Sequence, residues 1–568
     1  MQNLIETVSC KLLFFIYALY FFKTNNIYTF AGVDGSQKMH IVTNGNTSLH
    51  TSAVPSSQAY ITNTKYKVQT YKSSSLVLDD RPSSASLQIP PSCTGTTVSD
   101  GQPSPGRWVR RLGYAERFMT MAHDYGCMTT VYSLWLDSRV PLDFELFKRA
   151  SVLMFRKMPN LRLHVDYLED DLWWREMTRE VVDVEELTTE DVESTVQTLL
   201  CRRYRVHEGP LWFARFVTLD PDQGCVVDTN HNLKYKYVCI FGFHHNVSDG
   251  STNMKFCQVF LKVLNALVQG KDVSLCQEGT FSVPLQDEFG DQLTSIWFVI
   301  GMFLKRLFTV VLTLGLPLWN YTTYYKMPRE RASATHVVQN DLDETTTHKL
   351  LRRCKMEGVT LNSAFTAAAN LALYKMILAK NSNIDATNMY SQQAINMRRY
   401  WPKPLRENSF GCHISLLDLK FPTRRSDLTA FWEYTRGVHT IVHYHLTDSK
   451  RPLKVQPMSE RLILILRFNS LLADLGLPSA NDNHYTVTNM GNLSSTFPGT
   501  GEEVEVAKVL RSVSCQFMPT LCQHTLQTFR GRLCYSLDYY TQKMTRELAS
   551  QYVETIFDIL TSSIHTPN

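Results

Sequence analysis

Two adjacent histidines, His244 and His245, open the motif His-His-x-x-x-Asp-Gly, which ends with Asp249 and Gly250. A neutral imidazole, with an ordinary pKa of about 6.5, is well suited to taking a proton from an alcohol or amine near neutral pH. A histidine used in this way needs no serine or cysteine nucleophile, and the chain has no Gly-x-Ser-x-Gly motif. The motif therefore predicts that a histidine activates an acceptor while an acyl group arrives, and it disfavours a hydrolase triad.

Asp249 is a further candidate for chemistry, although its place around a turn from His245 predicts that it points away from the substrate. A buried carboxylate then needs a positive partner, because an unpaired buried charge is costly. Arg398, in the second half of the chain, is a candidate partner, but the sequence does not rank it above other arginines. Gly250 is expected to allow a backbone conformation or a close approach that a Cβ would block.

The elements that must position this motif follow from the hydrophobic pattern. Residues 233–243 predict a strand whose buried end stops at the histidines. After Gly250, apolar residues recur at helical spacing, which predicts a helix. The motif is therefore expected at a strand-to-helix junction, a common place for functional groups in a mixed α/β protein.

Other stretches complete a predicted α/β (α+β) body. Strands are expected at 129–136, 211–219, 484–490 and 531–539. Helices are expected at 143–158, at 348–380 with a break near Gly358, and at 545–563.

The composition excludes some classes of function. The 568-residue chain has a net charge of +5 and no long cluster of Lys and Arg, so nucleic-acid binding has little support. Its 13 cysteines include no C-x-x-C pair, which disfavours a zinc site or a disulfide framework. Buried, reduced thiols in a cytosolic setting are the expected state.

The chain divides by composition into five predicted segments. Residues 1–34 hold a short apolar run at 11–22, which is a signal, an anchor or an incidental apolar start. Residues 35–106, rich in Ser, Thr, Pro and Gly, predict a disordered tail. Two lobes are expected at 107–285 and 334–568. Between them, the insert 286–333 contains the apolar stretch 293–319, which either contacts a membrane surface as a shallow hairpin or packs within the protein.

Several motifs together resemble the CoA-dependent acyltransferase superfamily, which includes alcohol O-acetyltransferases and the condensation domains of peptide synthetases. Besides the histidine motif, the matching segments are LGYAERF at 112–118, PNLR at 159–162, GPLW at 209–212, GVTLNSAFTAAANLAL at 358–373, INMR at 395–398, residues 408–411, TNMG at 488–491 and GRLCYSLDY at 531–539. They occur in the family's order over roughly residues 107–565.

The resemblance implies two chloramphenicol-acetyltransferase-like lobes with a tunnel between them. It implies catalysis at the paired histidines, with His245 rather than His244 as general base, and a structural pair between Asp249 and Arg398. It also implies that Thr488, Asn489 and Gly491 line the tunnel. The implied substrates are acyl-CoA as donor and an alcohol or lipid as acceptor, with no cofactor or metal, and a monomer is expected.

Two details separate members of this superfamily. Many wax ester synthases have an Asn-Asp pair where this chain has Asn362-Ser363, and TNMG is more similar to the Ser-Asn-x-Gly segment of alcohol acetyltransferases. An alcohol O-acyltransferase is therefore favoured over a wax ester synthase/diacylglycerol acyltransferase, an amide-forming condensation enzyme and a catalytically silent binding protein.

One sequon bears on the compartment. Asn246-Val247-Ser248 is an N-glycosylation sequon inside the proposed active site, where a glycan would block the tunnel. The catalytic body is therefore expected to face the cytosol, in possible association with a membrane such as the endoplasmic reticulum.

Overall fold

A computed structural model describes residues 76–77, 106–189, 191–219, 235–281, 325, 334–401, 409–447, 466, 470, 483–497 and 502–565. The chain divides into units 1–72 and 73–568, and every described residue lies in the second. The predicted segment 1–34 lies outside the described residues. So do the tail 35–106 and the insert 286–333, apart from residues 76–77, 106 and 325.

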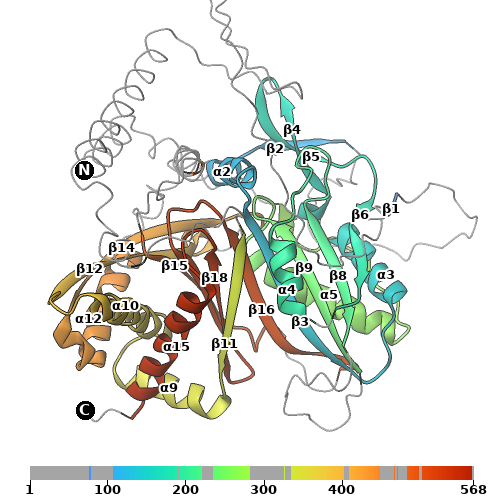
Figure 1. Ribbon diagram of the computed structural model, residues 1–568. Helices are drawn as coiled ribbons and strands as arrows, with labels where there is room; N and C mark the ends of the chain where they lie inside the picture. The colour runs from blue at the N-terminus through green and yellow to red at the C-terminus, as the bar shows by residue number, and fades with distance from the viewer. Residues whose placement is uncertain are drawn as a thin grey trace, which may run out of the picture. The chain divides into compact units, whose positions relative to one another are not determined.

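The first large sheet carries the histidine motif (Figure 1). Its strand order is β16-β3-β9-β8-β7, with β3 antiparallel to both β16 and β9, and β7 parallel to β8. The bounds are Cys127–Ser138 for β3, Val184–Leu187 for β7, Trp212–Thr218 for β8, Tyr235–His244 for β9 and Val504–Cys515 for β16.

Helices cover both faces of this sheet. Side chains alternate between the two faces along each strand, and the apolar side chains on both faces are buried by these helices. On one face, α3 (Phe144–Lys157) and α5 (Gly250–Val268) pack over Tyr132, Cys239 and Phe241. On the other face, α4 (Val192–Leu200) packs over Val131, Val238 and Ile240. The central strands are therefore buried on both sides, which explains their continuous apolar sequence.

The second large sheet has the order β11-β18-β17-β15-β12-β14 (Figure 1). Its strands are β11 (Thr335–Leu342), β12 (Ala386–Asn396), β14 (Ile414–Arg424), β15 (Tyr485–Asn492), β17 (Cys522–Phe529) and β18 (Arg532–Tyr540). The packed helices are α9 (Glu344–Met356), α10 (Leu361–Lys380), α12 (Phe431–Thr447) and α15 (Arg546–Ser563). Gly358, with φ +68°, lies at the predicted break between α9 and α10.

Smaller elements complete the described chain. A three-stranded sheet has the order β2-β5-β4, formed by β2 (Trp108–Arg111), β5 (Asp171–Glu176) and β4 (Leu163–Leu168). Two-stranded pairs join β1 (Leu76–Val77) to β6 (Val181–Val182), and β10 (Thr280–Phe281) to β13 (Ser409–Phe410). The short helices are α2 (Tyr114–His123), η1 (Pro159–Arg162), η4 (Met397–Tyr400) and η5 (Arg425–Leu428).

Two features of the domain division differ from the sequence prediction. Strand β16 belongs to the second half of the chain but pairs with β3 in the first sheet, so a cut at residue 334 does not separate the lobes. Nearly all of its residues are buried, because β3 lies beside it and β17 and β18 pack against it. In addition, Leu76–Val77 of the predicted disordered tail pairs with β6.

The predicted elements are otherwise confirmed to within a few residues. The strand expected before the motif is β9. The other expected strands are present as β3 (129–136 predicted), β8 (211–219), β15 (484–490) and β18 (531–539). Those expected as helices are α3, α5, α9, α10 and α15. Within the described part of the chain, no helix combines the length and apolar character needed to cross a membrane.

Candidate active site

The histidine motif occupies the loop between β9 and α5. Strand β9 ends at His244, and α5 begins at Gly250. Backbone hydrogen bonds fix the start of the loop, from His244 N to Leu211 O at 2.9 Å and from His245 N to Met128 O at 2.9 Å. Met128 has a φ of +68°, a conformation that costs energy for a residue with a side chain and that is often found at functional sites. The predicted strand-to-helix junction is therefore present.

His245 has one ring nitrogen hydrogen-bonded and the other without a partner among the described residues. Its Nδ1 lies 2.9 Å from the carbonyl oxygen of Ser248, which can only accept, so Nδ1 carries the proton of the neutral ring. The lone pair is then on Nε2, for which no described residue provides a hydrogen bond. Burial, reinforced by the positive charge of Arg511, lowers the pKa of His245 to about 4. The ring is thus neutral at pH 7 and able to accept a proton at Nε2.

His244 has a different environment. Its side chain is 0% exposed, and Nδ1 accepts a hydrogen bond from Asn246 N at 3.2 Å. The ring packs against His123, with centroids 4.5 Å apart, and against Tyr204 at 5.6 Å. Burial, together with the charges of His123 and His245, holds the pKa of His244 well below its ordinary value. These contacts suit a ring that supports the loop, whereas the sequence grouped both histidines as catalytic.

Asp249 and Arg398 form a buried ion pair that joins the two halves of the chain. Arg398 Nη1 lies 2.6 Å from Asp249 Oδ2, and the two side chains are 8% and 2% exposed. Asp249 is also the N-cap of α5, because its Oδ1 accepts from Thr252 N at 3.0 Å. His413 N donates to Oδ2 at 2.8 Å. Burial alone would raise the pKa of Asp249, but Arg398 and these neighbours hold it well below its usual range.

Thr252 and the carbonyls around Arg398 extend this network. Arg398 Nη2 donates to Thr252 Oγ1 at 2.9 Å and to Ser409 O at 3.0 Å. Thr252 Oγ1 in turn donates to Gly411 O at 3.0 Å. The ion pair is therefore satisfied on both sides by groups from α5 and from the segment around β13, which fixes the start of α5 and hence the histidine loop.

Gly250 lies where a second lobe comes close. A Cβ at this position would be 2.9 Å from both Sδ and Cε of Met490, which belongs to β15. The backbone of Gly250 has an ordinary negative φ, so space rather than backbone conformation explains the glycine.

The residues predicted to line a tunnel lie on β15 around Met490. This strand pairs with β12 only up to Val487, while its pairing with β17 continues to Asn492. Thr488 is partly exposed, and Asn489 and Gly491 are exposed. Within the described residues no hydrogen bond joins these residues to His245, and the tunnel stays a prediction.

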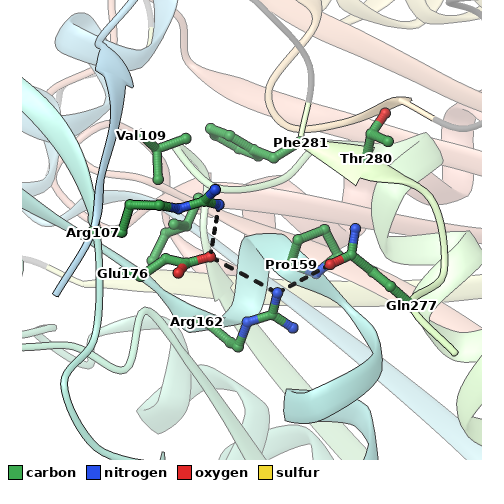
Figure 2. A pocket seen from close by; sticks show the side chains of 9 residues that line it. Arg107, Val109, Pro159, Arg162, Glu176, Gln277, Thr280 and Phe281 are labelled. Atoms are coloured by element: carbon green, nitrogen blue, oxygen red, sulfur yellow. Dashed lines mark hydrogen bonds and ion pairs between the residues drawn. The ribbon is translucent and has the colours of Figure 1, made fainter. Parts of the chain in front are cut away.

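A cavity of about 250 Å³ lies elsewhere, beside the three-stranded sheet (Figure 2). Glu176 points into it between two arginines, 3.3 Å from Arg107 and 3.9 Å from Arg162 (Figure 2). None of the predicted site residues lines this cavity. Phe281 forms part of its wall and lies on β10, which pairs with β13 near the Asp249–Arg398 network.

The N-cap role of Asp249 and three further residues of the site were not predicted from the sequence. Asp249 as N-cap had a readable signal, an aspartate directly before a helical pattern. Arg511, Thr252 and His413 had none, because the fold alone brings them to the motif from distant segments.

The sequon residue Asn246 is 0% exposed, and its Nδ2 donates to Thr120 Oγ1 at 3.0 Å. The described cysteines are free thiols.

Solved structures share the fold of this chain. TRI3 trichothecene 15-O-acetyltransferase from Fusarium sporotrichioides matches with a TM-score of 0.58 and 13% identity, over 82% of this chain and 99% of that one. Polyketide synthase associated protein 5 from Mycobacterium tuberculosis matches with a TM-score of 0.55 and 11% identity, over 81% and 99%. The first condensation domain of the calcium-dependent antibiotic synthetase matches with a TM-score of 0.54 and 16% identity, over 81% and 97%.

The chain has the condensation-domain fold. Its two α/β lobes correspond to the chloramphenicol-acetyltransferase-like architecture that the sequence predicted. No protein-family model matches the sequence, and no curated protein sequence matches it significantly. At identities of 11–16%, the likeness establishes the fold, and the activity has to be argued from the site.

Proposed function

We propose that this protein is an acyltransferase that moves an acyl group from acyl-CoA to an alcohol, with His245 as general base. The observation that supports this most is a buried, neutral His245 whose Nδ1 is bonded to Ser248 O and whose Nε2 has no partner among the described residues. Such a ring has one role available to it in the ground state, which is to accept a proton from a bound acceptor.

The reaction balances with this one residue. The acceptor hydroxyl gives its proton to Nε2 of His245 as its oxygen attacks the thioester carbonyl, which forms a C–O bond and a tetrahedral oxyanion. The intermediate collapses with cleavage of the C–S bond. The leaving thiolate of CoA takes the proton from the imidazolium, so the products are an ester and CoA thiol, and His245 returns to its neutral form.

The Asp249–Arg398 pair supports this step without taking part in it. Both oxygens of Asp249 are already bonded, to Arg398, His413 N and Thr252 N, and the side chain is 2% exposed. A carboxylate so occupied has no position from which to accept a substrate proton. Its role in this proposal is to hold the loop that carries His245.

A second candidate function follows from the fold. Because condensation domains share the fold, we weigh an amide-forming reaction with a carrier-bound donor. The same free Nε2 would then deprotonate an amine. Lipid esterification of the wax ester synthase type is the same chemistry with a longer acceptor.

The proposed compartment is the cytosol, where acyl-CoA is mostly used. The buried Asn246 supports this, because a glycan on a fully buried side chain is incompatible with the folded loop. Contact with a membrane through residues 293–319 remains part of the proposal, and a monomer is the proposed assembly state.

A thiol-release assay tests the function. Purified protein is incubated with acetyl-CoA or longer acyl-CoA and a panel of alcohols and amines, and free CoA and the ester or amide are quantified. Acceptor-dependent release with ester formation is the expected result. Amide formation only, or turnover only with a phosphopantetheinyl carrier as donor, would favour the condensation reaction.

Two variants make the assay specific to the site. His245→Ala should lose turnover while keeping the wild-type circular dichroism spectrum. His348→Ala, which removes an exposed histidine on α9, should keep both the turnover and the spectrum of the wild type. Full turnover of folded His245→Ala would refute the assignment of the base.

A further inference from the structure

Arg511 on β16 is a buried arginine that has no carboxylate of the described residues in ion-pair contact. It is 3% exposed. The other arginines in the buried set of the described residues, Arg162, Arg215 and Arg398, each have a carboxylate oxygen within 4.0 Å. No ion pair joins Arg511 to any carboxylate in the described chain. A buried charge without a partner is strongly destabilising, so this position calls for a counter-ion.

The hydrogen bonds of Arg511 leave part of its guanidinium unused. Nε donates to the hydroxyl of Tyr132 at 3.1 Å, and Nη1 donates to Thr525 Oγ1 at 3.1 Å. A guanidinium has five N–H groups in a planar fork, and the remaining ones have no acceptor among the described residues. The two hydroxyl groups fix the plane of the fork, whose other edge has no acceptor among the described residues.

The position of Arg511 places this free edge near the candidate active site. The Tyr132 hydroxyl lies 3.8 Å from where a Cβ of Gly250 would be. Thr525 on β17 is the register partner of Thr488, which is predicted to line the tunnel. The guanidinium therefore links Tyr132 of the sheet that carries the histidine motif to β17, the strand that pairs with the predicted tunnel residues on β15.

The charge of Arg511 affects the ionisation of the Asp538 carboxyl group. Asp538 nevertheless does not supply a full counter-ion. Its Oδ2 accepts from Val513 N at 2.9 Å, and Oδ1 is buried without a partner. Burial raises the pKa of Asp538 to about 7, so this group carries only part of a negative charge at neutral pH. Among the described residues, the positive charge of Arg511 is thus incompletely balanced.

We propose that Arg511 binds a carboxylate carried by one of the two substrates, an inference that rests on the proposed acyl transfer. The two oxygens of a carboxylate match the two parallel N–H groups of a guanidinium, which a neutral group does not. The carboxylate belongs either to the acceptor, as in a hydroxycarboxylic acid, or to the acyl chain of the donor, as in a dicarboxylic acyl-CoA. The chemistry at Arg511 is the same in both cases.

Matched substrate pairs test the proposal and separate the two sources. The acceptor arm compares a hydroxycarboxylic acid with its methyl ester, using one donor, and the donor arm compares succinyl-CoA with butyryl-CoA, using one acceptor. The wild-type protein should prefer the charged member in one arm. Arg511→Met should lower kcat/KM for that member by roughly 10- to 100-fold, mainly through KM. The preference, measured as kcat/KM for the charged member divided by kcat/KM for the uncharged member, should fall by a similar factor.

Two further variants serve as controls for charge and shape. Arg511→Lys keeps the charge but loses the fork, so it should retain part of the preference. Arg205→Met, which removes an exposed arginine, should behave as wild type in both arms. An equal fall of kcat on charged and uncharged members would overturn the proposal, because it would place the guanidinium at the reacting carbonyl. An unchanged preference in Arg511→Met would overturn it as well.

Thermal stability gives a readout that does not depend on activity. Arg511→Met should melt at or above the wild-type temperature, since it removes an unbalanced buried charge, and a lower melting temperature would indicate a structural role instead. The charged substrate should raise the melting temperature of the wild type and not of Arg511→Met. If His245→Ala keeps full turnover, the proposed function fails. If that variant is inactive but the wild type shows no preference for charge in either arm, this inference alone fails.

Discussion

Removal of the Asp249 carboxylate should destabilise the protein strongly, because it breaks a buried ion pair between the two halves of the chain. Asp249→Ala leaves Arg398 as an unpaired buried cation and leaves His413 N and Thr252 N without their acceptor. Breaking such a pair from one side costs about 3–5 kcal/mol. The loss of the N-cap of α5, which is usually worth about 1 kcal/mol, is included in that range.

The assay is urea denaturation, because an ionic denaturant would screen the exposed pair that serves as the control. For an m-value of about 3 kcal/mol per molar, the midpoint of the first unfolding transition should fall by roughly 1–1.7 M. Glu208→Ala is the control: it removes a carboxylate from an exposed pair with Arg205, with side chains 67% and 80% exposed, and should cost less than about 1 kcal/mol.

A double variant separates the pair from its surroundings. Asp249→Ala combined with Arg398→Met removes both charges, so its cost should be less than the sum of the single costs by up to about 3 kcal/mol. Costs that add to within about 0.5 kcal/mol would refute the pair as a source of stability. A fully stable but inactive Asp249→Ala would likewise contradict a structural role for this carboxylate.

Three further predictions concern the histidines. First, kcat/KM should stay level from neutral pH down to about pH 5 and fall below it, because the base titrates in free enzyme with a pKa of about 4; a fall centred near the ordinary value of about 6.5 would refute this. Second, His244→Asn, which retains an acceptor for Asn246 N, should keep kcat within about tenfold, while His245→Asn should lose about 100-fold or more; equal losses would refute the division of roles. Third, burial lowers the pKa of three other histidines, to about 4 for His123 and His484 and to about 3 for His524. These side chains therefore bind protons more weakly in the folded protein than in the unfolded chain. Their neutral forms favour folding above about pH 6.5, and that stability is lost as pH falls towards 4. The melting temperature measured from pH 7.5 to 4.5 should therefore decrease, and a constant value would contradict the reasoning.

The local elements of this fold could be predicted from the sequence because their patterns are short-range. The strand that ends at His244 and the helix that follows Gly250 are determined by neighbours in the chain, and the structure has both. The partner of Asp249 was different. Hydrophobic patterning did not distinguish Arg398 from other arginines, and only the resemblance of its segment to a known motif selected it.

Long-range pairing explains what the sequence did not reveal. Strand β16 reads as an ordinary apolar segment of the second half, yet it completes the first sheet beside β3. The same crossing brings Arg511 to Tyr132 across a separation of 379 residues. No local pattern encodes that contact, so neither the interwoven lobes nor the buried cation near His245 could be deduced before the fold was known.

The turnover of His245→Gly shows directly whether His245 is the general base. If it is, kcat should fall by about 10²- to 10⁴-fold, the usual contribution of a general base, while the circular dichroism spectrum stays unchanged. Added imidazoles should restore part of the rate, and more basic imidazoles should restore more of it. A folded His245→Gly protein that releases CoA within about threefold of the wild-type rate would contradict the account.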